Sequence, residues 1–279
     1  GAVLAIERDE WLRIDRIGVR LLGGDGIESV TWMYLKIALT GCGNGRARYV
    51  MIDEVQNYTE AQIAVLARYF RRAHLLLLGD ENQAIKPGTA SFAQVCALLE
   101  ELRGSVETCS LMTSYRSTPV ITELFARLAR SEDALRISSV RREQDAPIIA
   151  AYEDGAAYAQ ALRDVVAAAR ATDGLAAVIA PWKREAKRAA ELLGDDAPLL
   201  VDDRTLMPES GIVLMTLDQA QGLEFDYVVV PDASARLFPG DDEVARHRLY
   251  TTISRATRHI AILAHGKLTA LLDGANAEA

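Results

Sequence analysis

The sequence predicts an α/β fold in which parallel sheets are flanked by helices. Short runs of four or five apolar residues recur without polar alternation, which is typical of strands buried on both faces of a parallel sheet. Longer amphipathic stretches separate these runs, and strands that alternate with helices define the α/β class. The six expected strands lie at residues 49–52, 75–78, 176–180, 212–215, 227–230 and 260–263.

Four stretches between the expected strands are predicted to be helical. The first carries apolar residues at helical spacing, and the third is rich in alanine. In the second, Thr118 fits an N-cap and Pro119 fits the first helical position. A polar, charge-rich stretch at 131–146 is interpreted as a connection early in a second lobe. The expected helices lie at residues 59–72, 118–128, 156–170 and 243–254.

Composition and charge narrow the class of protein. The chain has 279 residues, of which 50% are hydrophobic and 25% charged, as in a globular protein of one large or two ordinary domains. No run of about 18 apolar residues and no signal-peptide pattern occurs, so we expect a cytoplasmic protein with no membrane partner. The net charge of -8 argues against a free-standing electrostatic nucleic-acid binder but leaves room for a local basic groove. The three cysteines fit a reducing cytosol better than a disulfide or zinc framework.

Two acidic stretches follow the first two expected strands, where open α/β sheets place their ligands. In Asp53-Glu54, one carboxylate can hold Mg²⁺ and the next can orient or deprotonate an attacking water. Gln83 ends the second stretch, and its amide can hydrogen-bond a terminal phosphate without adding charge. The alternatives are an acidic pair at a helix N-terminus and an ordinary turn rich in Gly, Asp and Asn.

Two further groups place an arginine beside other functional residue types. Tyr115 and Arg116 precede the 118–128 helix, and an aromatic ring can stack on a base while a guanidinium neutralises a phosphoryl group. Residues 219–226 lead into the fifth strand, and residues 249–256 close the last helix. Taken alone, each group is compatible with ordinary packing, a surface arginine or a turn.

Basic side chains cluster in two places. Lys183 and Arg184 follow the third strand, where a helix N-terminus can bind a nucleic-acid phosphate. The alternative is a solvated helix face. Trp182 is interpreted as packing rather than as a platform for a base, and the four histidines show no metal spacing. The other clustered cations are Lys187, Arg188, Arg246, Arg248, Arg255 and Arg258.

The order of the motifs is more specific than any one of them. Asp-Glu-Val-Gln at 53–56, Gly-Asp-Glu-Asn-Gln at 79–83, Tyr-Arg-Ser at 115–117, Gly-Leu-Glu-Phe-Asp at 222–226 and Leu-Tyr-Thr-Thr-Ile-Ser-Arg-Ala at 249–256 follow one another. In this order they resemble motifs II to VI of the UvrD/Rep-type superfamily 1 DNA helicases. The resemblance covers roughly residues 49–263. It implies P-loop NTPase (RecA-like) lobes, ATP hydrolysis, and single-stranded or partly duplex DNA as the partner, in the bacterial nucleoid.

The resemblance also implies catalytic roles for individual residues, with ATP and Mg²⁺ as cofactors. Asp53 would bind the metal, and Glu54 would act as general base or position the attacking water. Arg116 and Arg255 would be the two arginine fingers. Closure of the lobes would bring both arginines onto the phosphates.

Four further positions are implied to bind the nucleotide. Gln83 would sense the γ-phosphate, and Tyr115 would stack on the adenine. Glu224 would hydrogen-bond the ribose, with Gly222 allowing close approach of the backbone. Residues 1–118 would then be the C-terminal part of the first lobe with motifs II, III and IV, and residues 119–279 the second lobe with motifs V and VI. The roughly 95 residues between motif IV and the strand at 212–215 leave no room for a large accessory insertion.

Details of the motifs resemble the HelD-like branch of this family, which includes helicase IV-like proteins. These details are Gln-Asn-Tyr-Thr at 56–59, Gln-Ala-Ile-Lys-Pro at 83–87 and the stretch 31–40, which resembles the helix before motif II. HelD-like proteins associate with bacterial RNA polymerase, so a polymerase-binding remodelling factor is the alternative function. UvrD has aromatic residues after its third motif that stack on DNA bases, and they are absent here. Because stacking contributes about 1–3 kcal/mol per base, we expect a weaker grip on single strands.

The phosphate-binding motif G-x-x-x-x-G-K-[ST] does not occur in the sequence. The glycine-rich stretch 41–45 is followed by no Lys-Ser/Thr pair, so it is expected to be a loop. We therefore interpret the chain as a C-terminal part of a motor that is inactive alone, and the alternative is a degenerate, non-catalytic homologue. Two milder departures are Gln221, where the family usually has lysine, and Ser254, where it usually has threonine.

Overall fold

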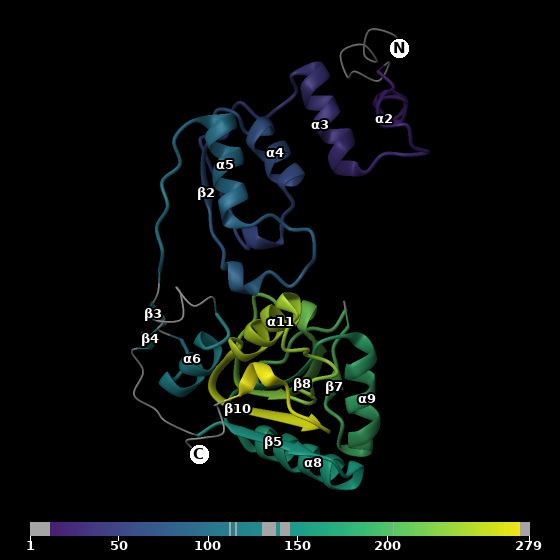
Figure 1. The fold of residues 1–279 in the computed structure, drawn as a ribbon, viewed down its shortest axis with the longest axis vertical. Coiled ribbons are helices and arrows are strands. Elements are labelled where there is room, and N and C mark those ends of the chain that lie inside the picture. The colour runs from purple at the N-terminus through teal and green to yellow at the C-terminus, as the bar shows by residue number, and fades with distance from the viewer. Residues whose placement is uncertain are drawn as a thin grey trace. The chain divides into compact units, whose positions relative to one another are not determined.

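The computed structural model describes residues 12–111, 113–114, 116–129, 138–139, 146–202 and 204–273. The chain divides into two compact units, Gly1–Cys109 and Ser110–Ala279 (Figure 1). The assignment of residues 1–118 and 119–279 to two motor lobes stays a prediction. Tyr115, the expected adenine-stacking residue, and most of the expected connection at 131–146 lie outside the described residues.

The first unit is built on two parallel strands. β1 (Tyr49–Ile52) and β2 (His74–Leu77) pair in register. Leu75 and Leu77 of β2 pack in a cluster with Ile63, Ala67 and Val95 of two helices. This agrees with the strands expected at 49–52 and 75–78. The helices of the unit are α2 (Ile14–Leu22), α3 (Ser29–Thr40), α4 (Glu60–Tyr69) and α5 (Phe92–Arg103), with short 3-10 helices η1 (Val55–Asn57) and η2 (Glu81–Gln83).

Side-chain hydrogen bonds fix the ends of the two packed helices. Thr59 and Ser91 each open a capping box, in which the hydroxyl accepts from the N3 backbone and the N3 glutamine accepts in return. At the other end, the guanidinium of Arg103 donates to carbonyl oxygens of Ala67 and Phe70, 2.9 and 3.1 Å away. These bonds satisfy main-chain groups that a helix end otherwise leaves unpaired.

One face of the two-stranded sheet is bare. Tyr49 and Met51 of β1 are 77% and 69% exposed, and Leu76 of β2 and the following Leu78 also point to solvent. The ring of Tyr49 stacks on His74 across the strands with centroids 5.4 Å apart. Parallel sheets are normally covered on both faces, so this row of apolar side chains is an uncovered packing surface.

The second unit contains a six-stranded, wholly parallel sheet in the order β5-β10-β9-β6-β8-β7, which confirms the predicted α/β class. Four of its strands were expected, and the two edge strands were not. In the edge strand β5, two of five residues are alanine, which has low β-propensity. The strands are β5 (Ile148–Tyr152), β6 (Leu175–Ala180), β7 (Leu199–Leu200), β8 (Gly211–Thr216), β9 (Phe225–Val230) and β10 (Ala256–His265).

Helices cover both faces of this sheet (Figure 1). The chain moves across the sheet in one direction through α8 (Gly155–Ala171) and α9 (Lys183–Leu193) and returns through α10 (Leu217–Ala220) and α11 (Glu243–Ile253). Because parallel crossovers are right-handed, the outgoing and returning helices lie on opposite faces. Fully buried side chains such as Leu162 and Val229 form the core beneath α8 and α9.

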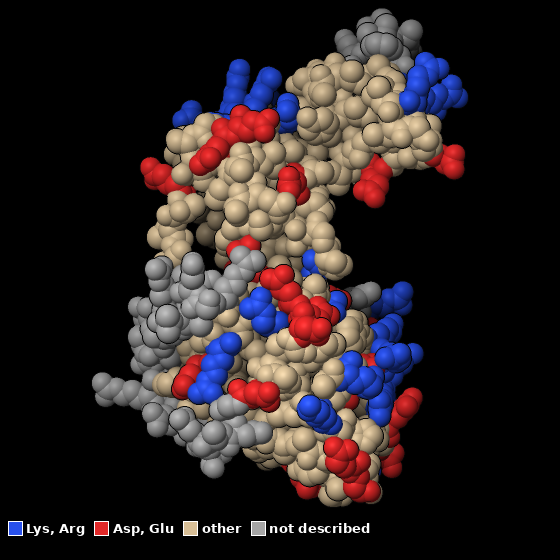
Figure 2. Space-filling model, viewed as in Figure 1, with Lys and Arg blue, Asp and Glu red and all other residues tan. Residues whose placement is uncertain are grey.

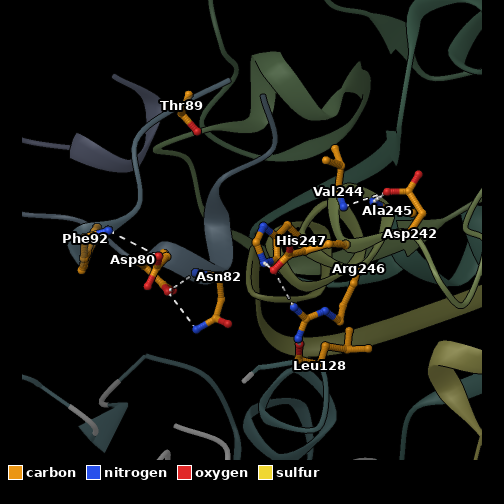
Figure 3. A network of polar contacts seen from close by, with 12 residues as sticks. Asp80, Asn82, Thr89, Phe92, Leu128, Asp242, Val244, Ala245, Arg246 and His247 are labelled. Atoms are coloured by element: carbon orange, nitrogen blue, oxygen red, sulfur yellow. Dashed lines mark hydrogen bonds and ion pairs between the residues drawn. The ribbon is translucent and has the colours of Figure 1, made fainter. Parts of the chain in front are cut away.

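α6 (Pro119–Ala126) packs against α11 in the same unit. Asp242 caps α11 by accepting from the backbone of Val244 and Ala245, and Arg246 donates to the carbonyl oxygen of Leu128, 3.2 Å away (Figure 3). Thr118 and Pro119 occupy the predicted N-cap and first helical positions, although the Thr118 hydroxyl makes no capping hydrogen bond. No helix among the described residues is long and apolar enough to cross a membrane.

Candidate functional site

Asp53 and Glu54 lie directly after β1, at the carboxyl end of the small sheet of unit 1. The backbone N–H of Glu54 donates to Oδ1 of Asp53 over 2.8 Å. Glu54 has φ 53°, the one positive φ among the described non-glycine residues. Left-handed backbone is strained for a residue with a side chain and is found preferentially at functional sites. The turn therefore holds two adjacent carboxylates in a fixed, strained geometry.

Gln56 joins this turn to the one that follows β2. Its amide nitrogen donates to Oε2 of Glu54, and its amide oxygen accepts from the backbone N–H of Asp80, 3.2 Å away. The side chain is almost completely buried, and it occupies the space that a Cβ on Gly79 would need. The sequence motif contained this glutamine, but its bridging role became visible only in the structure.

Gln83 is held by Asp80 after β2. Its amide nitrogen donates to Oδ2 of Asp80 over 2.9 Å. Oδ1 of Asp80 accepts from the backbone of Asn82 over 3.0 Å (Figure 3). The sequence-predicted residues Asp53, Glu54 and Gln83 thus gather at the carboxyl ends of two adjacent parallel strands. This is the edge at which open α/β sheets bind ligands.

The acidic turn fits Mg²⁺ that accompanies a phosphate ligand. Magnesium takes one or two carboxylates and keeps several waters or substrate oxygens, so a dedicated cage of protein ligands is not required. The Asp53 carboxylate is exposed, and a backbone N–H fixes one of its oxygens. The described residues contain no group of three or more His, Cys, Asp or Glu side chains suited to hold a metal by themselves.

In unit 2, Arg116 and Glu224 form an ion pair. The guanidinium Nη1 lies 2.6 Å from Oε1 of Glu224, and Nη2 donates to the carbonyl oxygen of Ser254 over 3.4 Å. The neighbouring Ser117 hydroxyl donates to the carbonyl oxygen of Ala256 over 2.7 Å, which fastens this segment to the start of β10. Both charged side chains are partly exposed, so the pair contributes at most about 1 kcal/mol and can open readily.

Arg255 lies beside this pair and is 3% exposed. Its Nε donates to the carbonyl oxygen of Thr251 over 3.2 Å, near the end of α11, and its Nη1 donates to that of Leu223 over 3.3 Å. A cation at a helix C-terminus is favourable. Arg255 therefore ties α11 to the turn that carries Gly222, whose φ of 74° is one that glycine adopts freely.

Arg116, Glu224 and Arg255 lie at the amino ends of β9 and β10, which are neighbours in the sheet. Residues 219–226 were predicted to lead into a strand and residues 249–256 to close a helix, and in the structure Glu224 directly precedes β9 and Arg255 lies between α11 and β10. The carboxyl ends of the same sheet carry Lys183 and Arg184, which follow β6. The structure therefore separates the predicted nucleotide residues of unit 2 from the predicted nucleic-acid residues by the length of the strands.

Both basic residues at the start of α9 are exposed. Arg184 forms an ion pair of 2.9 Å with the buried carboxylate of Glu185. Near Lys183, hydrogen bonds from the Thr205 hydroxyl and the backbone of Arg204 lower the pKa of Asp202, and the charge of Lys183 adds a smaller lowering. No pattern in the sequence indicates the Glu185 contact, because an acidic residue in a basic helix is usually solvated.

One segment of unit 2 is similar to a known protein family. Residues 211–263 match the family model for the UvrD-like helicase C-terminal domain. The matched segment runs from β8 into β10 and includes Gly222, Glu224 and Arg255. No curated protein matches the chain.

Solved structures of helicases are similar to the chain. One is the C-terminal domain of a possible DNA helicase from Lactobacillus plantarun WCFS1, with 28% identity, a TM-score of 0.48, and 59% of this chain and 95% of that chain covered. The PRRSV helicase has 19% identity and a TM-score of 0.44, with 80% of this chain and 36% of that chain covered. An Arterivirus nonstructural protein 10 (helicase) in complex with DNA has 18% identity and a TM-score of 0.41, with 81% and 41% covered.

Proposed function

We propose that the chain is the C-terminal motor part of an ATP-dependent superfamily 1 DNA helicase or translocase. The observation that carries the proposal is the meeting of Arg116, Glu224 and Arg255 at the amino ends of β9 and β10. Two of these residues lie inside the segment that matches the UvrD-like helicase C-terminal domain. The same three residue types appear in order in the sequence motifs.

The two arginines of unit 2 have different roles in this proposal. Arg116 is partly exposed and weakly paired, so its guanidinium can leave Glu224 for a transferring phosphoryl group. Glu224 is then free to accept from a ribose hydroxyl. Arg255 donates to main-chain carbonyls in the present conformation, so it positions the Leu223–Glu224 turn, and acting as a second arginine finger requires it to change partners.

Unit 1 carries the groups for the metal and the attacking water. ATP and Mg²⁺ are the proposed cofactors, and the metal supplies charge neutralisation at the phosphates when it is bound. Asp53 would hold the ion, and Glu54 would orient or deprotonate water. Gln83 would bind the terminal phosphate. To do so, its amide nitrogen must give up its hydrogen bond to Asp80.

The bare face of the β1–β2 sheet supports a larger first lobe. We propose that further secondary structure, which includes a phosphate-binding loop, packs on Tyr49, Met51, Leu76 and Leu78. Burying four large apolar side chains contributes on the order of 6–12 kcal/mol, at about 1.5–3 kcal/mol each. Without such a loop, the β- and γ-phosphates have no backbone cradle, and we expect the 279-residue chain to hydrolyse ATP slowly or not at all.

The test is DNA-stimulated ATP hydrolysis by a form of the protein that includes the phosphate-binding loop. We expect Glu54→Gln to abolish turnover, and Arg116→Ala to lower kcat by about 10³- to 10⁵-fold, as for an arginine finger. Glu107→Gln, a carboxamide change at an exposed position outside the motifs, is the matched control. Normal turnover by Glu54→Gln would contradict the proposal.

The alternatives from the sequence stay predictions. A polymerase-remodelling role predicts that the protein co-purifies with RNA polymerase, and that this association survives Glu54→Gln. A degenerate homologue predicts no ATP hydrolysis by any form of the protein. Efficient unwinding of a duplex without polymerase association would favour the helicase.

A further inference from the structure

Four exposed arginines gather at the amino ends of the two strands of unit 1, the edge opposite the acidic turn. Two of them directly precede β1, and two lie between α4 and β2. Because Tyr49 pairs with His74 in parallel register, both segments lie at the same edge of the sheet. Figure 2 shows Lys and Arg side chains gathered at the upper end of unit 1, with Asp and Glu side chains beside them. The arginine edge consists of Arg46, Arg48, Arg71 and Arg72.

Main-chain contacts hold the two segments of the arginine edge together. The backbone N–H of Asn44 donates to the carbonyl oxygen of Tyr69 over 2.8 Å. The backbone N–H of His74 donates to the carbonyl oxygen of Arg48, also over 2.8 Å. Glycine at position 43 permits the close approach, because a Cβ on Gly43 would lie 2.7 Å from the carbonyl oxygen of Tyr69. The arginines are therefore presented from a fixed backbone.

The turn before β1 is also fixed by a side chain. Oδ1 of Asn44 accepts from the backbone N–H groups of Arg46 and Ala47 over 2.9 and 3.0 Å. The side chain of Arg72 lies over this turn, with Nη1 3.9 Å from the position that a Cβ on Gly45 would take. The cations of the two segments thus form one surface.

The guanidinium groups of the arginine edge are not neutralised within the described part of the chain. Among the residues that the structure describes, no carboxylate pairs with them and no carbonyl oxygen accepts from them. By contrast, Arg103 donates to main-chain carbonyl oxygens, and Arg116 pairs with Glu224. The chain has 39 acidic residues against 31 basic ones, so carboxylates are abundant elsewhere. Unpaired positive charge gathered in one place selects an anionic partner.

An aromatic pair borders the arginine edge. Tyr49 directly follows Arg48, its side chain is 77% exposed, and its ring stacks on His74. Tyrosine and arginine are enriched at protein interfaces and carry much of their binding energy. The planar guanidinium group matches the geometry of a carboxylate, with which it can form two parallel hydrogen bonds. This composition fits a partner that carries both carboxylates and apolar side chains.

We infer that the arginine edge is a docking surface for an acidic segment of a protein partner. Carboxylates of the segment pair with the arginines, and one of its apolar side chains packs on the ring of Tyr49. A short segment is favoured over nucleic acid because charges act over only about 8 Å at physiological salt. An extended polyanion would run beyond the arginines onto a chain whose net charge is -8, whereas a short segment meets only the local field.

The docking surface is separate from the proposed nucleotide site. Four residues at about 3.3 Å each place roughly 13 Å of strand between the arginine edge and Asp53. A partner bound to the arginines therefore leaves the acidic turn open. The inference goes beyond the proposed function and does not depend on ATP hydrolysis.

Binding of labelled poly-L-glutamate to the 279-residue chain tests the charged part of the surface. We expect Arg71→Ala/Arg72→Ala to raise the Kd by roughly 2- to 30-fold, as for two exposed ion pairs. Arg46→Ala/Arg48→Ala should have a similar effect. Arg71→Lys/Arg72→Lys keeps the charge and removes the planar fork, so it should restore only part of the affinity.

The chain offers a matched control in Arg16 and Arg20. Both are exposed on α2 of the same unit, so Arg16→Ala/Arg20→Ala makes the same change in net charge. This variant should leave the Kd for poly-L-glutamate unchanged. If it weakens binding as much as Arg71→Ala/Arg72→Ala, the polymer responds to overall charge and the docking surface is refuted. Equal urea midpoints of the two variants would show that folding does not cause the difference.

A copolymer of glutamate and tyrosine tests the aromatic part, because it supplies carboxylates together with apolar rings. It should bind more tightly than poly-L-glutamate, and Tyr49→Ala should remove this difference. Tyr49→Phe should keep it, since the ring is retained. Equal affinities of the unchanged chain for the two polymers would overturn recognition of a protein segment.

Competing probes distinguish the other occupants. If duplex DNA or pyrophosphate displaces poly-L-glutamate and binds more tightly through Arg71 and Arg72, the surface takes phosphates and the inference is overturned. If sedimentation finds a dimer that Arg71→Ala/Arg72→Ala dissociates, the occupant is a second copy of the chain and a separate partner is excluded. None of these results bears on ATP hydrolysis, which the Glu54→Gln variant tests.

Discussion

Replacing Arg255 by alanine should destabilise unit 2, because the structure gives this residue a structural role. Its guanidinium is buried and donates to the carbonyl oxygens of Thr251 and Leu223. Hydrogen bonds to a charged group contribute about 1.5–3 kcal/mol each, and unpaired buried carbonyls add a desolvation cost. The two bonds therefore predict a loss of about 3–6 kcal/mol in the free energy of unfolding. At about 2–4 °C per kcal/mol for a unit of this size, Tm should fall by about 6–24 °C.

Urea unfolding followed by the fluorescence of Trp182 measures this loss in unit 2, in a chain whose other tryptophans are replaced by phenylalanine. Arg116→Ala is the control, because its exposed pair with Glu224 predicts a loss of at most about 1 kcal/mol. Equal stability of the two variants would refute the structural role of Arg255. If the difference is found, an inactive Arg255→Ala enzyme says little about catalysis, and Arg116→Ala becomes the informative variant.

Three further predictions concern local packing and titration. Gly79→Ala should lower the free energy of unfolding of unit 1 by about 1–3 kcal/mol, because the new methyl group displaces Gln56. An unchanged midpoint in denaturant unfolding would show that Gln56 moves aside freely. Leu162→Ala should cost about 2–5 kcal/mol in unit 2, since the side chain is fully buried, and a loss under 1 kcal/mol would contradict the packing. The Thr205 hydroxyl lowers the pKa of Asp202. This contact therefore stabilises the fold above the ordinary carboxyl pKa, and the stabilisation is lost as pH falls through the lowered pKa. NMR titration should find a higher Asp202 pKa in Thr205→Val.

The sequence predicted the central strands well because burial on two faces leaves a simple apolar signature. Val178 and Val229, both fully buried, lie in such runs. The edge strand β7 has two residues, Leu199 and Leu200, and both are exposed, so no comparable run exists. A strand as short and exposed as β7 therefore has no apolar signature in the sequence.

The candidate site was predictable as a set of residues but not as a geometry. Motif order brought together Arg116, Glu224 and Arg255, and the structure places them side by side. The order of the motifs does not indicate that Arg255 is buried and donates to main-chain carbonyls. These contacts depend on how α11 packs against the turn at Leu223. The pairing of Glu185 with Arg236 joins residues far apart in the chain, so no local pattern reports it.

The position of β9 gives the two ends of the unit 2 sheet a mechanical link. Glu224 directly precedes this strand, and Asp232, the partner of Arg236, follows it two residues beyond its end. Six residues at about 3.3 Å each make the strand roughly 20 Å long, and it is buried between β10 and β6. A buried central strand cannot bend without breaking hydrogen bonds on both sides, so a movement of the Glu224 end is transmitted to the Arg236 end. Exchange of the Arg116–Glu224 pair on nucleotide binding would thus be felt at the Asp232–Arg236 ion pair at the other end of β9.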